Sequence, residues 1–472
     1  MTRVVIIGGG VVGLCCSVLL AKDGHEVTVL ERDPEEPPAP DAAWSSWNRR
    51  AVNQFRMLHS ILPRFNQVMR VEAPEIITAM KDAGALCSNA VADIPADFTG
   101  GFRDADTRFD AVTARRPVAE AAIAAVAART PGVTVRRGEV VGSLLCGTPL
   151  ADGIPHVIGV RTATGEEIAA DLIVDAGGRR SNLPDLLEAI GARPPLEERA
   201  DSGFVYYGRH FRSSDGSIPP AFGPPLIPLG SISVLTLAAD NGTWGLGVIT
   251  SARDAAMRRL SDVETWSRVI AKCPLIAHWT DAEPLDEEVA VMAKIEDRHR
   301  TFVIDGRPVA TGIVAVADAW ACTNPSVGRG ISIGILQATA LRDVLRAAPG
   351  DGVEFARAYH DRTMETAEPW YRSTLAFDNA RLAEMHAAID GTPFEPDPVY
   401  ECTLQLIAAM MKDPEILRSF LETVGVLTLP EELFARPGMI ERLGELGGGW
   451  RNERSPGPNR EELLACVGAG AS

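Results

Sequence analysis

The sequence predicts an α/β fold: a parallel sheet with flanking helices, interrupted by an inserted antiparallel sheet and followed by a helical C-terminal region. Three observations predict this arrangement. Glycine-rich turns at residues 8–13 and 325–330 each lie between a strand-like apolar run and an apolar, helix-like run. Alternating, aromatic-rich segments lie between the two turns, at 201–212 and 230–250. Beyond residue 350 the pattern is that of helices.

Composition limits the class of protein. The chain has 472 residues, enough for about two or three domains, and 46% hydrophobic residues with 23% charged ones are ordinary for a soluble globular protein. A net charge of −17 disfavours nucleic acid and anionic membranes as partners, because both repel an acidic protein. The eight cysteines show neither CxxC pairs nor zinc-like spacing, so we expect no metal site and a reduced, cytoplasmic setting. We expect neither a signal peptide nor a transmembrane segment, since no apolar run reaches the ~18–20 residues of a span.

The first glycine turn has the spacing of a dinucleotide-binding site. A β-branched run at 3–7 leads into Gly8, Gly10 and Gly13 in a G-x-G-x-x-G pattern, and an apolar helix-like run follows. The second strand-like run ends at Glu31, where a carboxylate can bind ribose hydroxyls and would repel a 2′-phosphate. The pyrophosphate is favoured by the helix N-terminus. The turn therefore predicts an FAD or NAD site of the Rossmann type.

The second glycine turn selects the cofactor. Residues 302–316 read as a hairpin followed by a strand, and Asp318 stands at its end, where a carboxylate can hold a ribityl hydroxyl. Pro325 stiffens the loop, and Gly328 and Gly330 allow close approach at the start of a long helix. The positive end of that helix stabilises negative charge on a reduced flavin. Two turns suit a ligand with two ends, so the sequence predicts FAD.

The second turn also resembles the second FAD motif of para-hydroxybenzoate-hydroxylase-type flavoprotein monooxygenases, roughly G-D-A-A-H-x-x-x-P-x-x-G-x-G-x-N. The matching residues are Asp318, Pro325, Gly328 and Gly330, and the departures are Ala317, Ala321 and Ser332. Features of the related flavin-dependent halogenases and geranylgeranyl reductases are present too. The resemblance covers about residues 1–350.

Three further segments support this resemblance. Residues 47–55 resemble the R-x-G-V element, with Arg49 as the arginine that reaches the FAD, Ala51 in place of the glycine and Arg50 as a rival one position away. The segment 113–127 resembles the helix that begins with an arginine near the cofactor, here Arg116, and 132–141 resembles the strand whose backbone meets adenine. The cofactor-binding residues predicted from the turns and implied by the resemblance are Gly8, Gly10, Val12, Gly13, Glu31, Arg32, Arg49, Arg116, Val141, Gly178, Asp318, Pro325, Gly328, Gly330 and Ile331.

The stretch 170–187 departs from the hydroxylase pattern. In the place of D-G-x-x-S-x-x-R it has Gly177 for the aspartate and Pro184 for the final arginine. Its VDAGGRRS resembles the D-A-x-G-x-x-S of halogenases and geranylgeranyl reductases, where Asp175 and Gly178 would support the fold and the FAD. The electron donor is therefore NADH or NADPH acting directly, or a separate flavin reductase. A halogenase would need a W-x-W-x-I-P motif and a reactive lysine, and neither is recognisable in the sequence.

The resemblance implies a division of the chain. We expect residues 1–190 and 296–350 to form the FAD-binding domain, with about 70–105 as a candidate part of the substrate side. Residues 190–295 form the substrate-binding sheet, and 351–472 form the helical region. Pocket candidates in the inserted sheet are Tyr206, Tyr207, His210 and Trp244. Alternation places Tyr206 and Tyr207 on opposite faces, so we expect at most one of them to line the cavity directly, with His210 as a candidate base. Met410 and Met411 are expected in the core.

The function implied is that of an FAD-dependent monooxygenase. Such an enzyme inserts one oxygen atom from O2 into a small organic substrate, by hydroxylation or epoxidation, through a flavin C4a-hydroperoxide, as in secondary metabolism. No catalytic side chain is strictly required for that step, in keeping with the absence of any recognisable triad. The alternatives are a geranylgeranyl-reductase-like or halogenase-like flavoenzyme, an NAD-dependent dehydrogenase and a non-catalytic FAD-binding protein.

Overall fold

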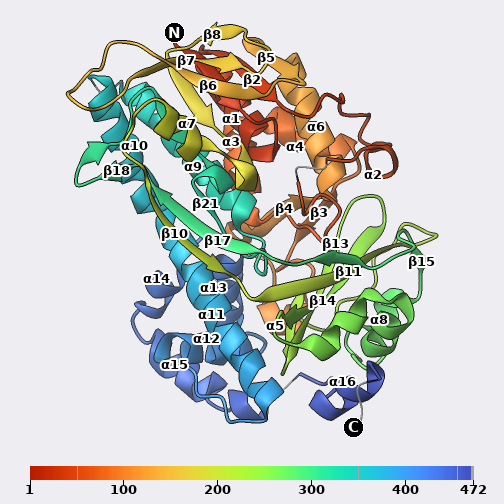
Figure 1. Ribbon diagram of the computed structural model, residues 1–472. Coiled ribbons are helices and arrows are strands. Elements are labelled where there is room, and N and C mark those ends of the chain that lie inside the picture. Colours follow the sequence, from red (N-terminus) through yellow and green to blue (C-terminus); the bar gives the residue numbers. More distant parts are fainter. Residues whose placement is uncertain (50–51, 349, 454, 469–472) are drawn as a thin grey trace.

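The computed structural model describes residues 1–49, 52–348, 350–453 and 455–468. Figure 1 shows three regions: an α/β part around the N-terminus at the top, an antiparallel sheet at the lower right, and most of the C-terminal helices at the lower left. The predicted fold class is confirmed in all three respects. Within the described residues, every helix is too short or too polar to cross a membrane.

A parallel sheet organises the α/β part. Its strands run in the order β20 (Ile313–Ala315), β9 (Leu172–Asp175), β1 (Arg3–Ile7), β2 (Glu26–Glu31) and β5 (Val133–Arg137). All four neighbouring pairs are parallel. The central strands are buried on both faces, which explains why they read as continuous apolar runs rather than alternating ones.

Helices cover one face of this sheet and a small sheet covers the other. On the first face α1 (Val11–Lys22) packs between α6 (Arg116–Arg129) and α9 (Gly330–Ala347). On the second lie α7 (Leu183–Ala189) and the antiparallel strands β6 (Val141–Cys146), β7 (Val157–Thr162) and β8 (Glu167–Ala169). The segment expected as one strand at 132–141 is split between β5 and β6, because Gly138 turns the chain with a φ of 73°.

A helical hairpin and a small two-stranded sheet extend the first face. They comprise α3 (Pro63–Glu72), α4 (Pro74–Asp82), β3 (Leu86–Asn89), α5 (Ala96–Thr99), η1 (Asp104–Phe109) and β4 (Asp110–Thr113). Here α4 packs against α6, whereas α5 contacts the C-terminal helices. The segment 70–105 therefore contacts both the α/β part and the C-terminal helical region.

The inserted sheet is joined to the α/β part by two long antiparallel strands. β10 (Leu196–Asp201) leads the chain out and β17 (Glu296–Thr301) leads it back beside it. The sheet itself contains β11 (Phe204–Arg212), β12 (Leu226–Leu229), β13 (Ile232–Ala238), β14 (Thr243–Ser251), β15 (Glu283–Pro284) and β16 (Ala290–Met292). β13 and β14 meet at Asn241 and Gly242, both with positive φ, as expected of the predicted turn.

The C-terminal region is mainly helical, as predicted. It comprises α10 (Gly352–Thr366), α11 (Glu368–Asp390), α12 (Pro398–Ala409), α13 (Pro414–Val424), α14 (Pro430–Phe434), α15 (Met439–Gly447) and α16 (Arg460–Cys466). The long helix α11 lies against the inserted sheet at β14. The remaining short elements are α2 (Ala43–Ser46), α8 (Val263–Ile270), β18 (Val303–Ile304), β19 (Arg307–Pro308), β21 (Ala321–Cys322), η2 (Gly178–Arg180), η3 (Ala255–Ser261), η4 (Ala277–Thr280), η5 (Ala317–Ala319) and η6 (Trp450–Asn452).

Candidate functional site

One large cavity lies where the three regions meet. Its volume is about 1730 Å³, and its walls come from both glycine turns, the inserted sheet and the C-terminal helices. Pockets for single drug-sized ligands measure roughly 300–1,000 Å³. The cavity therefore has room for a dinucleotide cofactor together with a second organic molecule.

The first glycine turn packs tightly against the protein at Gly8 and Gly13 and is open toward the cavity at Gly10. A Cβ added at Gly13 would lie 2.1 Å from the carbonyl oxygen of Gly8, and one added at Gly8, whose φ is +106°, would lie 2.5 Å from the carbonyl oxygen of Ala176. At Gly10 an added Cβ would meet nothing within 4 Å. The backbone thus presents a bare surface to the cavity beside the N-terminus of α1, which suits a phosphate group.

The second glycine turn presents a similar surface about 300 residues later. Gly328 has a φ of +67°, and Gly330 is the first residue of α9. A Cβ added at either glycine would meet nothing within 4 Å, and both line the same cavity. Because α1 and α9 pack side by side, two helix N-termini face one ligand space, as the sequence predicts for a two-ended cofactor.

Glu31 and Arg49 form a buried charge cluster below the first turn. Glu31 is 3% exposed, accepts hydrogen bonds from the backbone N–H of Gly9 (2.7 Å) and of Asp33 (2.9 Å), and pairs with Arg49 at 2.5 Å. These partners outweigh the opposing effect of burial and lower the pKa of Glu31. Arg49 also pairs with Asp33 and with Glu120, so most of its donors are engaged within the protein. Its contact with FAD stays a prediction.

Two residues of the R-x-G-V element are outside the part of the chain that the structure describes. Arg50 and Ala51 lie outside the described residues. Arg116 begins α6, as predicted, and its Nε donates to Glu120 at 3.3 Å.

Asp318 and the 175–181 turn border the same cavity. Asp318 lines the cavity and pairs with Arg179, with 3.4 Å between Oδ2 and Nε. Asp175 is buried and accepts hydrogen bonds from the N–H of Gly177 (2.8 Å) and from the hydroxyl of Ser181. Burial raises the pKa of Asp175. These bonds hold Gly178 at the cavity wall.

Every cofactor-binding residue predicted from the sequence lies on the cavity lining. The set comprises Gly8, Gly10, Val12, Gly13, Glu31, Arg32, Arg49, Arg116, Val141, Gly178, Asp318, Pro325, Gly328, Gly330 and Ile331. The fold brings these scattered positions to one surface, although their individual contacts with a cofactor stay predictions.

Two of the predicted pocket residues lie elsewhere. His210 is 2% exposed and outside the lining; its Nδ1 lies 2.9 Å from Asp286 and its ring packs on Trp44. Trp244 is also outside the lining, buried behind the sheet, where its Nε1 donates to the carbonyl oxygen of Trp279 at 2.9 Å. Neither residue lies in the pocket, for two different reasons. Trp244 faces an apolar cluster with Phe211 and Trp266 on the far side of the sheet, whereas His210, on the same face as Tyr206, is covered by Trp44 and bound to Asp286.

The structure also corrects the expectation that at most one of Tyr206 and Tyr207 lines the cavity. Tyr206 and Tyr207 do pack into different clusters, one on each face of β11. Both nevertheless contribute to the lining, because the cavity extends to Phe222 and Trp279 on the side of Tyr207. Tyr206 donates its hydroxyl to Asn324 at 2.8 Å, close to the second glycine turn.

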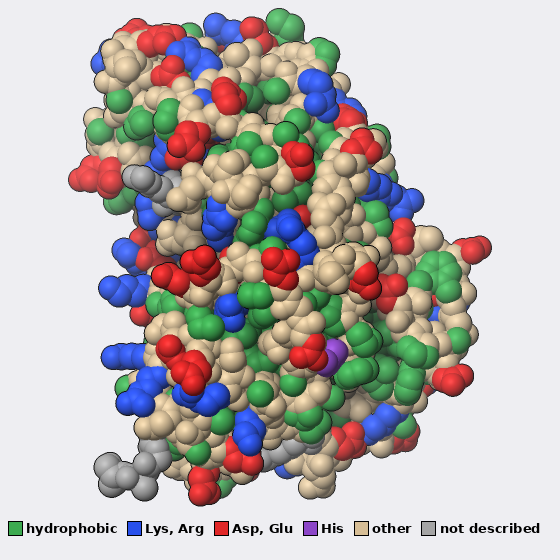
Figure 2. Space-filling model, turned by 90° about the vertical axis from the view of Figure 1, so that its right-hand side faces the viewer, with side chains coloured by type: hydrophobic (Ala, Val, Ile, Leu, Met, Phe, Trp, Pro, Cys, Tyr) green, Lys and Arg blue, Asp and Glu red, His purple; other side chains and the backbone are tan. Residues whose placement is uncertain are grey.

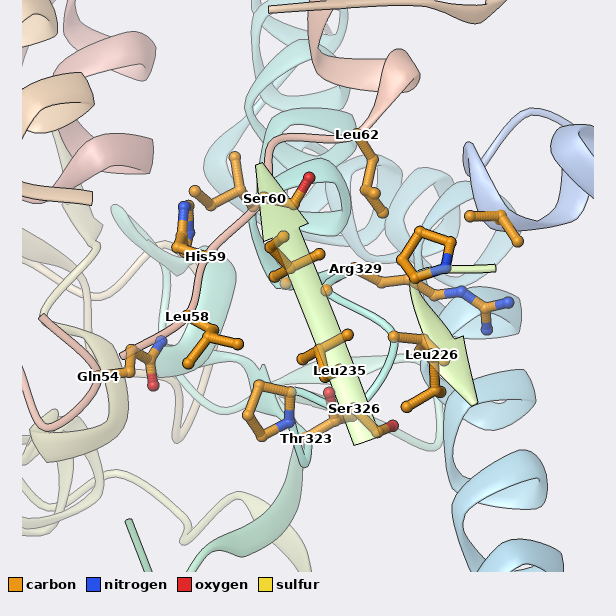
Figure 3. A pocket seen from close by; sticks show the side chains of 18 of the residues that line it. Gln54, Leu58, His59, Ser60, Leu62, Leu226, Leu235, Thr323, Ser326 and Arg329 are labelled. Carbon is orange, nitrogen blue, oxygen red and sulfur yellow. The ribbon is translucent and has the colours of Figure 1, made fainter. Parts of the chain in front are cut away.

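Several lining residues carry no sequence signal. His59 replaces His210 as the histidine of the cavity; burial and the nearby Arg116 lower its pKa to about 3, and its Nδ1 has no partner within the described residues. Ser326 and Arg329 lie inside the second turn, at positions that the motif leaves free. Met410 is buried in the core, as expected, but Met411 is 39% exposed, and both line the cavity (Figure 3 shows part of this lining).

Comparison with known proteins finds similarity to flavoproteins. Residues 3–56 match the family model of FAD dependent oxidoreductases. Protein Rv3254 of Mycobacterium tuberculosis is 27% identical over 447 residues, which is 90% of this chain and 89% of that protein. The flavin-dependent brominase Bmp2 superposes with a TM-score of 0.62 at 16% identity, over 94% of this chain and 98% of its own. OxyS anhydrotetracycline hydroxylase from Streptomyces rimosus gives a TM-score of 0.55 at 17% identity, over 90% of this chain and 76% of its own.

These findings confirm the resemblance predicted from the two glycine turns. The family match falls on the first turn, and the structural likeness extends over most of the chain. At 16–17% identity the solved structures establish the fold and leave the reaction open.

Proposed function

We propose that this chain, an FAD-dependent oxidoreductase, is a monooxygenase that inserts one oxygen atom of O2 into an organic substrate. The observation that carries the proposal is the continuity of the cavity. A single space runs from the bare backbone of the two glycine turns into a chamber with apolar walls, so a cofactor and a substrate would share it. When bound, FAD supplies the activation of O2.

The residues of the chain would hold the cofactor by its two ends. The first turn and the N-terminus of α1 suit the pyrophosphate, and Glu31 keeps acceptor capacity for the ribose. Asp318 suits a ribityl hydroxyl, and the N-terminus of α9 suits the pyrimidine edge of the flavin. The bare surfaces over Gly10, Gly328 and Gly330 fit a ligand that approaches the backbone closely.

The substrate part of the cavity would position the substrate and exclude water. Leu58, Leu226 and Leu235 surround the space next to the second turn (Figure 3). An apolar, closed site protects a reactive oxygen donor from water. His59 lines the cavity, and burial and the nearby Arg116 lower its pKa to about 3, so its ring is neutral at pH 7.

A second candidate is a reductase that saturates an alkene without oxygen. The 175–181 turn favours it, because VDAGGRRS resembles the geranylgeranyl reductases and the structure closes this turn through Asp175 and Ser181. A halogenase has less support, since no lysine is found among the described residues of the cavity lining.

The test is an anaerobic titration of the purified yellow protein with NADH or NADPH, with and without an added flavin reductase, followed by admission of O2. We expect the flavin to be bleached under one of these conditions, then reoxidised with consumption of O2. Bleaching by the nicotinamide alone indicates a self-sufficient enzyme, and a requirement for the reductase indicates a two-component system. A reduced flavin that is stable in air, or protein purified without FAD, would contradict the proposal.

A further inference from the structure

Arg329 is a buried cation in the wall of the substrate part of the cavity. It precedes α9, its side chain extends toward α11, and it is 8% exposed. Its Nη1 donates to the hydroxyls of Ser373 (3.3 Å) and Thr374 (3.2 Å), and its guanidinium lies 5.2 Å from the ring of Trp370. Its Nε has no partner within the described residues.

No carboxylate of the described residues forms an ion pair with Arg329. The two acids that influence it are Asp378 and Glu431. Asp378 is engaged with Ser326, and burial raises its pKa to about 7, so it is only partly charged at neutral pH. Glu431 is exposed at the margin of the cavity, where water screens it. Burial lowers the pKa of Arg329 to about 10, and the side chain therefore stays protonated without a full counter-charge.

The surroundings of this cation are apolar over a large area. Leu58, Leu226 and Leu235 lie around the same space as Arg329 and Ser326 (Figure 3). Toward the solvent, the lining includes large side chains that remain exposed: Phe98 (42%), Phe222 (59%), Val399 (53%), Met411 (39%) and Val424 (39%). Figure 2 shows hydrophobic side chains gathered around a hollow on one face of the molecule. Exposed apolar surface of this extent marks a site that binds an apolar partner.

We propose that the substrate is an amphipathic acid: a large apolar body with a carboxylate that pairs with Arg329. A guanidinium matches a carboxylate in charge and in planar geometry, and Ser373, whose hydroxyl accepts a hydrogen bond from Arg329, offers its own proton on the same lining. The apolar body would lie along the leucines and reach the exposed side chains at the cavity mouth. This inference rests on the proposed function only in taking the cavity as the substrate site.

The test compares two probes of equal chain length, decanoate and decan-1-ol, by calorimetric titration of the FAD-loaded protein. We expect decanoate to bind at least roughly tenfold more tightly, because a charge-assisted hydrogen bond in a buried site has that effect. In Arg329→Gln this preference should fall to less than about twofold, whereas Arg329→Lys should keep part of it. Arg362→Gln removes the same charge from an exposed position outside the cavity, and should leave the preference unchanged.

Two outcomes would overturn the inference. The first is equal affinity of the wild-type protein for decanoate and decan-1-ol, which would mean that the buried cation does not select carboxylates. The second is an Arg329→Gln protein that keeps the preference but loses FAD or changes the reduction potential of the flavin, which would make Arg329 a cofactor residue. Neither readout depends on turnover. If the protein prefers decanoate but consumes no O2, the monooxygenase proposal is wrong, whereas the inference about the substrate class is still supported.

Discussion

Asp378, on α11 behind the second glycine turn, is a carboxyl group with too few partners. Its Oδ1 accepts the hydroxyl of Ser326, and its Oδ2 has no hydrogen-bond partner within the described residues. Desolvation is the largest influence and raises its pKa from 3.8 to about 7. The native protein therefore holds a proton on Asp378 over a pH range in which the unfolded chain has lost it.

This carboxyl group should make the protein less stable as the pH rises. Between pH 3.8 and about 7 the native state binds more protons than the unfolded state through this group, so its contribution to the free energy of unfolding falls over that window. Replacing Asp378 by Asn should make the loss of stability between pH 4.5 and 7.5 smaller, by about 3 kcal/mol. Urea unfolding at several pH values measures this pH dependence of the free energy of unfolding. Asp361→Asn, at an exposed position on α10, should keep the wild-type slope; an unchanged slope in Asp378→Asn would mean that Asp378 is already ionised.

At the residue scale, the sequence predicts glycines and acids better than pocket side chains. The glycine turns are local, and the backbone alone explains Gly8 and Gly13. His210 was predicted as a pocket base and His59 was not, because contacts with Trp44 and Asp286, distant in the sequence, remove His210 from the cavity. Arg329 occupies a free position of a motif, so only its burial and its neighbours reveal it.

The pairing of α1 with β1 depends on glycines with opposite surroundings. Gly13 packs against the backbone of Gly8, and Gly10 faces open space. Adding a methyl group therefore has a different structural effect at Gly13 than at Gly10. At Gly13 it would force the helix away from the strand, whereas at Gly10, whose backbone is extended, it would only narrow the cavity.

Gly13→Ala should therefore lower the free energy of unfolding by about 1–3 kcal/mol through overpacking. Gly10→Ala should change it by less than about 0.5 kcal/mol, yet weaken FAD binding, because its Cβ occupies space that the pyrophosphate needs. Thermal unfolding of the apoprotein and titration with FAD separate the two effects. If Gly10→Ala binds FAD as tightly as the wild type, the cofactor does not approach this turn as proposed.

At the element scale, prediction works where the signal is contained in one segment. The strands of the parallel sheet and the turn at Asn241 and Gly242 follow from apolar runs and positive-φ residues. The split of 132–141 into β5 and β6 was missed, because the strand-like residues on both sides of Gly138 read as one run.

A buried ion pair joins the C-terminal helices to the N-terminal half of the chain. Arg418, on α13, pairs with both carboxylate oxygens of Asp106 at 2.9 and 2.7 Å, and also donates to the carbonyl oxygens of Thr99 and Gly101. Both charged side chains are at most 4% exposed. The pair connects segments more than 300 residues apart and fixes one wall of the cavity.

Removing this arginine should destabilise the whole molecule. Arg418→Ala leaves Asp106 charged, buried and without its partner, and should cost about 3–5 kcal/mol. Arg346→Ala removes an exposed arginine that binds Asp23 with similar geometry, and should cost less than about 1 kcal/mol. Denaturant unfolding of both variants gives the comparison. Equal losses would show that burial does not set the strength of the Arg418 pair.

At the scale of the molecule, the predicted helices beyond residue 350 are present, but their role was not predictable. Their sequence shows a helical pattern without showing what they cover. Only the tertiary arrangement reveals that α12 and α13 contribute walls of the cavity, and that α11 contributes Ser373 beside Arg329.

The order in which the parallel sheet is completed has a consequence for synthesis on the ribosome. β9 ends at Asp175, and its outer neighbour β20 begins only at Ile313, after the whole inserted sheet. At about 5–20 residues per second, the intervening 137 residues take roughly 7–27 s to emerge. During that time one edge of the nascent sheet has open hydrogen-bonding groups, whereas the inserted sheet, drawn from the continuous segment 204–292, can already pair internally. The parallel sheet, whose first strand begins at Arg3, is therefore completed only after the inserted sheet has been synthesised.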